Sequence, residues 1–263
     1  MAPDAGRDPL LEQLLRSLEW TCHTLWLVDR REPELLELHE QRGSTGFPHY
    51  ILSRAGMLPA SEWSDALFVL PGGLVERMRE RCLALGPQEY LDLALDAGSR
   101  ALRRLRPEEP GPELWRLSRS AGGGGGLPQA WVGQPATKDA HRDFLQAAMA
   151  VREGRALAHY RAASSRELKP PELLELTARQ PGGDRGLPQG LYRWSDDDVA
   201  QAEAALRGRG LLAADGEASK RGQALWADLE AETDRWSREL LAPCSAQELQ
   251  ALGQTLRGYS ASS

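Results

Sequence analysis

Two polar residues interrupt an otherwise apolar helical stripe in the second half of the chain. The stripe contains Leu145, Met149, Arg152, Ala156 and His159, at offsets of 4, 3, 4 and 3, which is the spacing of one face of an α-helix. A buried arginine must be paired and a buried histidine must be hydrogen-bonded. The stripe therefore predicts either a structural ion pair with a satisfied core histidine, or a polar spot in an apolar cavity.

The second alternative gives these polar residues chemical roles. Arg152 would orient an anionic group, with Met149 and Arg54 completing the ligand-binding residues. His159 would act as general base near neutral pH, and Glu153 would be the second catalytic residue. Arg54 also stands at a predicted helix end, where an arginine commonly binds a last carbonyl group.

The sequence predicts no cofactor and no metal. Cys22 and His23 are adjacent, but no third ligand follows at a metal-site spacing. The five glycines of 122–126 are interpreted as a flexible surface loop. A phosphate-binding loop would also need a Lys and a Ser or Thr leading into a helix.

The residues of the stripe need a long helix, and the sequence predicts one over 141–163 with Asp139 as its cap. The segment 127–133 before it is interpreted as extended. The first half of the chain is predicted to be entirely helical because its apolar residues recur at helical spacing between Pro and Gly breaks. The predicted helices of this half are 10–29, 34–42, 47–56, 61–70, 74–85 and 88–105.

The stretch 169–241 has the order of a winged helix-turn-helix. A helix over 171–179 ends at Pro181-Gly182-Gly183, and Ser195 has the position of an N-cap before a second helix that reaches about Arg207. Asp215-Gly216 is typical of a two-residue turn and predicts one short β-hairpin. A last helix begins at about Ser219. The fold class is therefore mainly α, with an all-helical N-terminal half packed on a winged-helix-like C-terminal half.

The charge pattern argues against DNA as a partner. The second helix of a DNA-reading motif enters the major groove, yet this one begins with Asp196, Asp197 and Asp198. Basic residues follow only at the far end of this helix and beyond it, at Arg207, Arg209, Lys220 and Arg221, and the chain carries a net charge of −6.

Composition places the chain among ordinary globular proteins. Its 263 residues make the chain long enough to bury a sizeable core. Of these residues, 27% are charged and 41% are hydrophobic, which is ordinary for a globular protein. The three cysteines are far apart and favour a reducing cytoplasm. No segment is apolar over 18 residues and no signal peptide is recognisable, so we expect a cytoplasmic protein with no membrane contact.

The predicted domains follow from these breaks. They are a disordered lead over 1–8, an all-helical domain over 9–106, a Pro- and Gly-rich connection over 107–138, a winged-helix-like domain over 139–258, and a tail over 259–263.

A series of short motifs follows one another over nearly the whole chain. They are Pro33-Glu34, the segment 46–55, Phe68-Val69-Leu70-Pro71, Trp131, Pro135, Arg152-Glu153 with His159, the segment 192–196, Arg209-Gly210-Leu211-Leu212, Asp215-Gly216 and Gly222 to Leu225. In this order the motifs resemble a helix-turn-helix family found mostly in actinobacteria. The resemblance extends from about Leu10 to Gly258, and it implies the two-part helical architecture given above and no particular activity.

Three functions follow from the sequence. The first is a small-molecule-binding protein whose scaffold has lost DNA binding. The second is an enzyme of specialised, natural-product metabolism that performs general acid/base chemistry, such as an intramolecular cyclisation, in the same pocket. The third is a winged-helix DNA-binding regulator. A homodimer or a small partner protein is left open.

Overall fold

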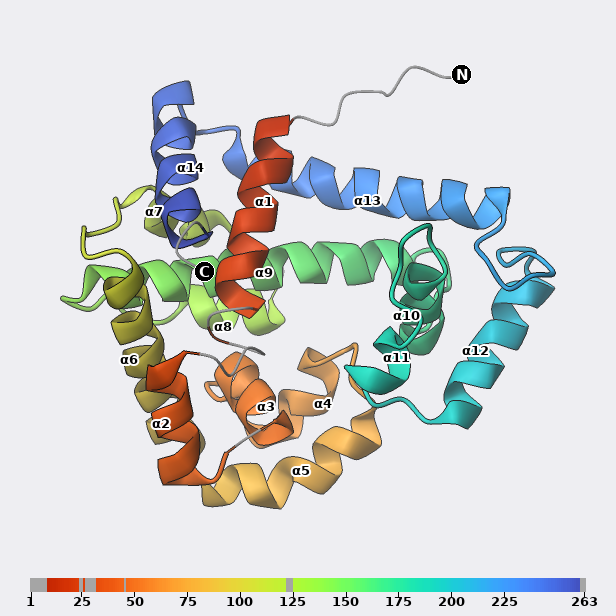
Figure 1. Ribbon diagram of the computed structural model, residues 1–263, viewed down its shortest axis with the longest axis horizontal. Coiled ribbons are helices and arrows are strands. Elements are labelled where there is room, and N and C mark those ends of the chain that lie inside the picture. The colour runs from red at the N-terminus through yellow and green to blue at the C-terminus, as the bar shows by residue number, and fades with distance from the viewer. Residues whose placement is uncertain (1–8, 24–25, 27–31, 45, 122–124, 261–263) are drawn as a thin grey trace. The chain divides into compact units, whose positions relative to one another are not determined.

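The computed structural model describes residues 9–23, 26, 32–44, 46–121 and 125–260. Helices dominate this part of the chain (Figure 1), which confirms the predicted mainly α fold. The predicted lead over 1–8, most of the segment 24–31 and part of the glycine run lie outside the described residues.

The helices begin and end close to Pro, Ser, Asp and Gly signals in the sequence. Their bounds are α1 Pro9–Cys22, α2 Pro33–Arg42, α3 Phe47–Ala55, the 3-10 helix η2 Ala60–Glu62, α4 Trp63–Ala66, α5 Gly72–Ala84, α6 Pro87–Leu105, α7 Glu113–Ala121, α8 Gly126–Val132, α9 Ala140–Ser164, α10 Pro170–Ala178, α11 Leu187–Gly190, α12 Asp196–Gly208, α13 Lys220–Leu241 and α14 Ala246–Ser260.

The chain divides into two compact units that do not follow the order of the sequence. Unit 1 contains residues 1–60, 80–155 and 237–263, and unit 2 contains residues 61–79 and 156–236. The domain boundaries predicted from sequence, with 9–106 and 139–258 as the two main bodies, stay a prediction.

Unit 1 is organised around the first part of α9. Every residue from Phe144 to Gly154 is buried, so this segment is surrounded by protein on all sides rather than amphipathic. Within the unit, α1 packs on α14, α2 and α3 pack on α6, and α7 packs on α8 (Figure 1). Gly98 of α6 allows a close approach, because a Cβ there would lie 2.7 Å from Leu145 Cδ2.

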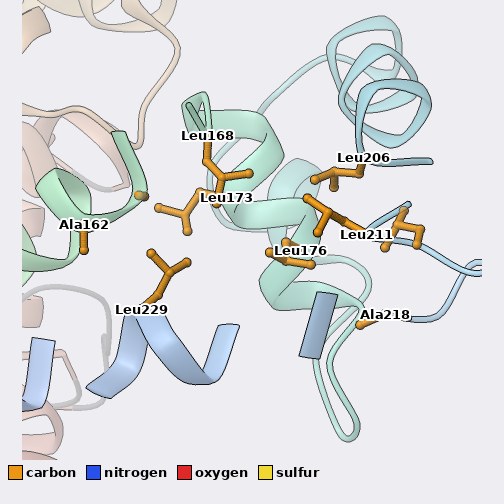
Figure 2. Packing of buried hydrophobic residues seen from close by; sticks show 10 residues of the cluster. Ala162, Leu168, Leu173, Leu176, Leu206, Leu211, Ala218 and Leu229 are labelled. Carbon is orange, nitrogen blue, oxygen red and sulfur yellow. The ribbon is translucent and has the colours of Figure 1, made fainter. Parts of the chain in front are cut away.

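Unit 2 is built around an aliphatic core. Figure 2 shows leucines of α10, α12 and α13 and the segment after α12 gathered into one cluster. The ring of Phe68 stacks on Tyr160 at 5.0 Å beside this cluster. The buried members are Ala162, Ala163, Leu168, Leu173, Leu176, Leu206, Leu211, Leu212, Ala218 and Leu229.

The helix-turn-helix part of the prediction has its counterpart in α10 and α12, which pack on each other in unit 2 (Figure 1). Ser195 caps α12 as expected, because its Oγ accepts a hydrogen bond from the Asp198 amide at 3.1 Å.

The predicted β-hairpin after α12 is not confirmed. Among the described residues this segment forms an isolated antiparallel bridge between Leu212 and Ala218 and no strand. A turn is present, but its loop has three residues, 214–216, and not the predicted two. The Ala213 amide donates to the Glu217 carbonyl at 2.8 Å, and Gly216 has a φ of 86°. Both hydrogen bonds of the bridge are present, since the Ser219 amide also donates to the Leu211 carbonyl at 2.9 Å. The pairing extends no further because Gly210 has a φ of 68° on one side and α13 begins at Lys220 on the other.

Two further segments differ from the sequence analysis. The segment 127–133, interpreted as extended, is mostly the helix α8, whose first turn accommodates Pro128 because a proline needs no donor there. Helix α14 was not predicted, although its signal is in the sequence. Ser245 and Glu248 form a capping box, in which the Ser245 amide donates to Glu248 Oε2 at 2.8 Å.

Candidate functional site

A group of charged side chains lies inside unit 1, and we call it the charged cluster. Its members are Glu19, His23, Arg54, Arg152 and Glu153. Helix α9 supplies two adjacent members, α3 supplies Arg54, and α1 and the residue directly after it supply the other two. Segments that are distant in sequence therefore contribute charges to one place.

Arg54 and Glu153 form the buried half of the cluster. The guanidinium Nε and Nη2 donate to the two carboxylate oxygens at 2.7 and 2.6 Å, which is a bidentate pair. The side chains are 0% and 2% exposed. Arg54 Nη1 donates to the Tyr50 hydroxyl at 2.8 Å, and Trp131 Nε1 donates to the Arg54 carbonyl at 3.1 Å. The guanidinium thus binds a carboxylate and a hydroxyl, whereas the sequence analysis allowed a helix-end carbonyl.

Arg152 connects this buried pair to the surface. Its Nη1 donates to Glu153 Oε1 at 2.6 Å, whereas its Nε and Nη2 lie 3.2 and 2.8 Å from His23 Nε2. Glu19 Oε1 lies 2.6 Å from the same His23 nitrogen and 3.9 Å from Arg152 Nε. Since Glu19 is 52% exposed and Arg152 only 6% exposed, the cluster extends from the interior to solvent.

Burial and the arginines act on the proton affinities in opposite directions. Burial raises the pKa of Glu153, but Arg54 and Arg152 outweigh it and lower that pKa. Burial and then the charge of Arg152 lower the pKa of His23. Burial also raises the pKa of Glu19, yet the bond to His23 and the charge of Arg152 bring it to about 2. At neutral pH the cluster holds charged arginines and carboxylates around a neutral imidazole.

The structure brings together three of the five predicted site residues, namely Arg54, Arg152 and Glu153. Met149 lies one turn before Glu153 on α9 and is fully buried. His159 lies on the same helix but belongs to unit 2. The ligand-binding and catalytic roles given to these residues stay predictions.

His159 has its own polar surroundings. Its Nδ1 lies 3.1 Å from Thr233 Oγ1 and 3.5 Å from Glu230 Oε1, and the ring of Trp226 packs edge-on at 5.5 Å between centroids. Since Thr233 Oγ1 donates to the Leu229 carbonyl at 2.8 Å, the hydroxyl can only accept from the imidazole. His159 is therefore held with its proton on Nδ1, as the hydrogen-bonded histidine of the first alternative requires.

Sequence reasoning missed two members of the charged cluster and one neighbour. His23 was considered only as a metal ligand, and Glu19 and the neighbouring Tyr50, which binds Arg54, were not considered. The spacing of Glu19 and His23 by four residues is a helical pairing signal. No signal connects Arg54 to Glu153, because 99 residues separate them.

The charged residues of α12 and of the segment after it bear on whether the helix-turn-helix can meet DNA. Asp196 and Asp197 are exposed at the start of α12. Arg207 donates to Glu203 Oε1 and to the Ala213 carbonyl, and Arg209 donates to the carbonyls of Arg166 and Glu167. These two arginines hold the ends of the motif together.

The chain belongs to the Helix-turn-helix family. The model of this family matches residues 16–263, which is nearly the full length. No curated protein and no solved structure matches the chain. The match supports the resemblance found from the motif order.

Two further properties concern the described residues alone. No helix formed by them is long and apolar enough to cross a membrane. Within the same residues, no three His, Cys, Asp or Glu side chains are grouped in a way that would hold a metal ion.

Proposed function

We propose that the chain binds a small anionic molecule on a helix-turn-helix scaffold that has lost DNA binding. The observation that carries this proposal is the orientation of Arg152. Its Nε and Nη2, the edge of a guanidinium that forms bidentate pairs, face His23 Nε2 at 3.2 and 2.8 Å. A carboxylate or phosphate offers two oxygens to that edge, whereas an imidazole offers one lone pair.

In Arg54 the same edge of the guanidinium binds both oxygens of a carboxylate. Its Nε and Nη2 bind both oxygens of Glu153 at 2.7 and 2.6 Å. The two arginines thus share one buried carboxylate, and the second negative charge comes from Glu19, which is 52% exposed. An anionic ligand would take the place of Glu19 and His23 on Arg152 and would bring its charge deeper into the protein.

Native mass spectrometry of the protein purified from its own host tests the proposal. We expect a discrete small anionic molecule to co-purify with the wild type and to be absent from Arg152→Gln. The variant keeps both bonds between Arg54 and Glu153, so it is expected to fold. Arg142→Gln is the matched control, because it removes the ion pairs to Asp92 and Asp96 in the same unit. A ligand that survives in Arg152→Gln would contradict the proposal.

A second variant acts in the opposite direction. Glu19→Gln removes the carboxylate that competes for His23 and Arg152, so the fraction of protein carrying the ligand should rise. We expect the affinity for the ligand to increase on the order of tenfold, which corresponds to about 1.4 kcal/mol, and the occupancy to rise with it as far as saturation allows. Equal occupancy in Glu19→Gln and the wild type would show that the ligand does not use this edge of Arg152.

The family match favours a DNA-binding regulator as the second candidate. Against it stand the exposed aspartates of α12 and the intramolecular bonds of Arg207 and Arg209. Fluorescence anisotropy with a pool of short random-sequence duplexes at low salt separates the two. We expect no binding. A salt-sensitive signal that decreases in Lys220→Gln and Arg221→Gln would make the regulator the better function.

A further inference from the structure

A continuous chain of hydrogen bonds runs between two buried histidines of unit 1. His39 Nδ1 lies 3.2 Å from Ser44 Oγ, Ser44 Oγ lies 2.8 Å from the Tyr90 hydroxyl, and that hydroxyl lies 2.8 Å from His49 Nδ1. His49 Nε2 lies 2.7 Å from the Trp26 carbonyl oxygen. The four side chains are at most 5% exposed, and the two imidazole rings meet edge-on at 4.6 Å between centroids.

The far end of this chain fixes the positions of the protons. A carbonyl oxygen only accepts, so His49 Nε2 carries a proton in every state. When His49 is neutral, its Nδ1 is a lone pair and must accept the Tyr90 proton. Tyr90 then accepts from the Ser44 hydroxyl, and Ser44 accepts from His39 Nδ1. Neutral His39 therefore has its proton on Nδ1, whereas neutral His49 has its proton on Nε2.

A proton on His49 Nδ1 reverses the direction of every bond in the chain. His49 now donates to Tyr90, Tyr90 donates to Ser44, and Ser44 donates to His39 Nδ1. His39 must then be neutral with its proton on Nε2. A proton that arrives at His39 Nε2 can reach this state without leaving the chain, because each hydroxyl passes one proton on and receives another. The charge moves from one imidazole to the other while the number of protons stays constant.

Two charged histidines do not fit the same chain. If both Nδ1 atoms donated, Ser44 and Tyr90 would each accept a hydrogen bond from a histidine. Their two hydroxyl protons would then both have to use the single contact between the Ser44 and Tyr90 oxygens. One buried hydroxyl proton would lose its acceptor, and two positive charges would lie in rings 4.6 Å apart. We propose that His39 and His49 share a single proton through Ser44 and Tyr90, so that the pair is a relay that carries one charge and excludes a second.

Titratable and charged groups also lie near the relay. Arg42 and Cys82 act on Tyr90, and burial, as the largest cause, raises the pKa of Tyr90 to about 12 and that of Cys82 to about 11. Both groups are therefore neutral near pH 7. Arg42 is paired with Glu89 at 2.7 Å, and Arg81 donates to the Gly43 carbonyl at 2.7 Å. The histidines are thus the groups in the relay that gain or lose charge between pH 5 and 8.

The relay makes the stability of unit 1 sensitive to mild acid. Below about pH 6.5, where free histidines titrate, the unfolded chain binds a proton at each of the two residues, whereas the folded pair binds one. The folded state is therefore favoured above that pH and loses stability as the pH falls. A difference of one proton changes the unfolding equilibrium constant about tenfold per pH unit.

Nitrogen-15 NMR of the imidazole rings tests the relay on the full-length polypeptide. At alkaline pH we expect His39 with its proton on Nδ1 and His49 with its proton on Nε2. On acidification we expect His39 to change to the Nε2 form as His49 becomes charged, with no folded species in which both rings carry two protons. His39 staying unchanged while His49 is charged would overturn the proposal, and so would a folded protein with both rings charged.

Ser44→Ala provides an independent test because it interrupts the chain in the middle. The link between Tyr90 and His49 is kept, and we expect the nitrogen of neutral His39 that carries the proton to become independent of the charge of His49. Tyr90→Phe is the second interruption if Ser44→Ala does not fold, which the amide spectrum reports. Ser118→Ala is the matched control, because this buried serine donates to the Trp115 carbonyl away from the chain. A His39 proton that still changes from Nδ1 to Nε2 as His49 becomes charged, in both interrupted variants, would contradict the relay.

Discussion

The centre of unit 1 holds two guanidinium groups around a carboxylate, whereas the core cluster of unit 2 is built from leucines and alanines. Both are buried, but they depend on different physics. An apolar core is stabilised in proportion to buried area and tolerates apolar side chains of similar volume. A buried ion pair is stabilised only while its partners are complete, because each charge has already lost its water. The difference teaches which substitutions each unit accepts.

The largest effect is expected when one partner of the bidentate pair is removed. Arg54→Met keeps much of the volume but leaves Glu153 with Arg152 alone and removes the bond to Tyr50. We expect a loss of about 3–5 kcal/mol in the free energy of unfolding, measured by denaturant titration. The exposed pair of Arg42 and Glu89 provides the control, since Arg42→Met should cost about 0–1 kcal/mol. Equal losses in the two variants would show that the charged cluster is not the centre of unit 1.

The corresponding substitution in unit 2 is expected to be mild. Leu206 is fully buried in the core cluster, and Leu206→Met conserves its volume, so the cost should stay below about 1.5 kcal/mol. Leu206→Ala leaves a cavity and should cost about 2–5 kcal/mol. Denaturant titration of the pair measures the contrast. If Leu206→Met lowered the free energy of unfolding as much as Leu206→Ala, unit 2 would require the exact shape of its core side chains. The contrast with unit 1, which requires complete ion pairs, would then be lost.

The same contrast explains which parts of the structure were predictable from sequence. Local signals found most helix ends, because caps such as Ser195 and helix-starting prolines such as Pro87 act within a few residues of the end. The stripe on α9 also predicted that Arg152 needs a partner if it is buried. Each of these inferences needs only neighbouring residues.

The unpredicted parts depend on contacts that are distant in sequence. The pairing of Arg54 with Glu153 and the approach of His23 to Arg152 join segments separated by 99 and 129 residues. Hydrophobic periodicity says which face is buried but not which segment covers it. Another distant contact lies beside the bridge after α12, where the Ala218 amide donates to the Arg179 carbonyl.

The smallest effect concerns the response of the two units to acid. In the folded protein, burial and the charge of Arg152 lower the pKa of His23 from 6.5. Burial raises the pKa of Glu153, but Arg54 and Arg152 outweigh it and lower that pKa from 4.5. A group with a lowered folded pKa contributes stability above its unfolded pKa, and this stability is lost as the pH falls through the folded value. The charged cluster therefore weakens below pH 6.5 through His23 and further below pH 4.5 through Glu153, whereas the aliphatic cluster takes up no protons.

Hydrogen exchange with mass spectrometry resolves this difference by segment. Protection of α3 and the buried part of α9, corrected for the intrinsic rate, should fall between pH 7 and 5 before protection of α10 and α12. His23→Gln removes the first titration and keeps a polar side chain, so the acid sensitivity that remains in α3 must come from other groups, including the relay of His39 and His49. If the variant and the wild type lost protection in parallel from pH 7 to 5, the imidazole of His23 would not be the neutral acceptor for Arg152. In that case its contact with Glu19 at 2.6 Å would be the dominant one.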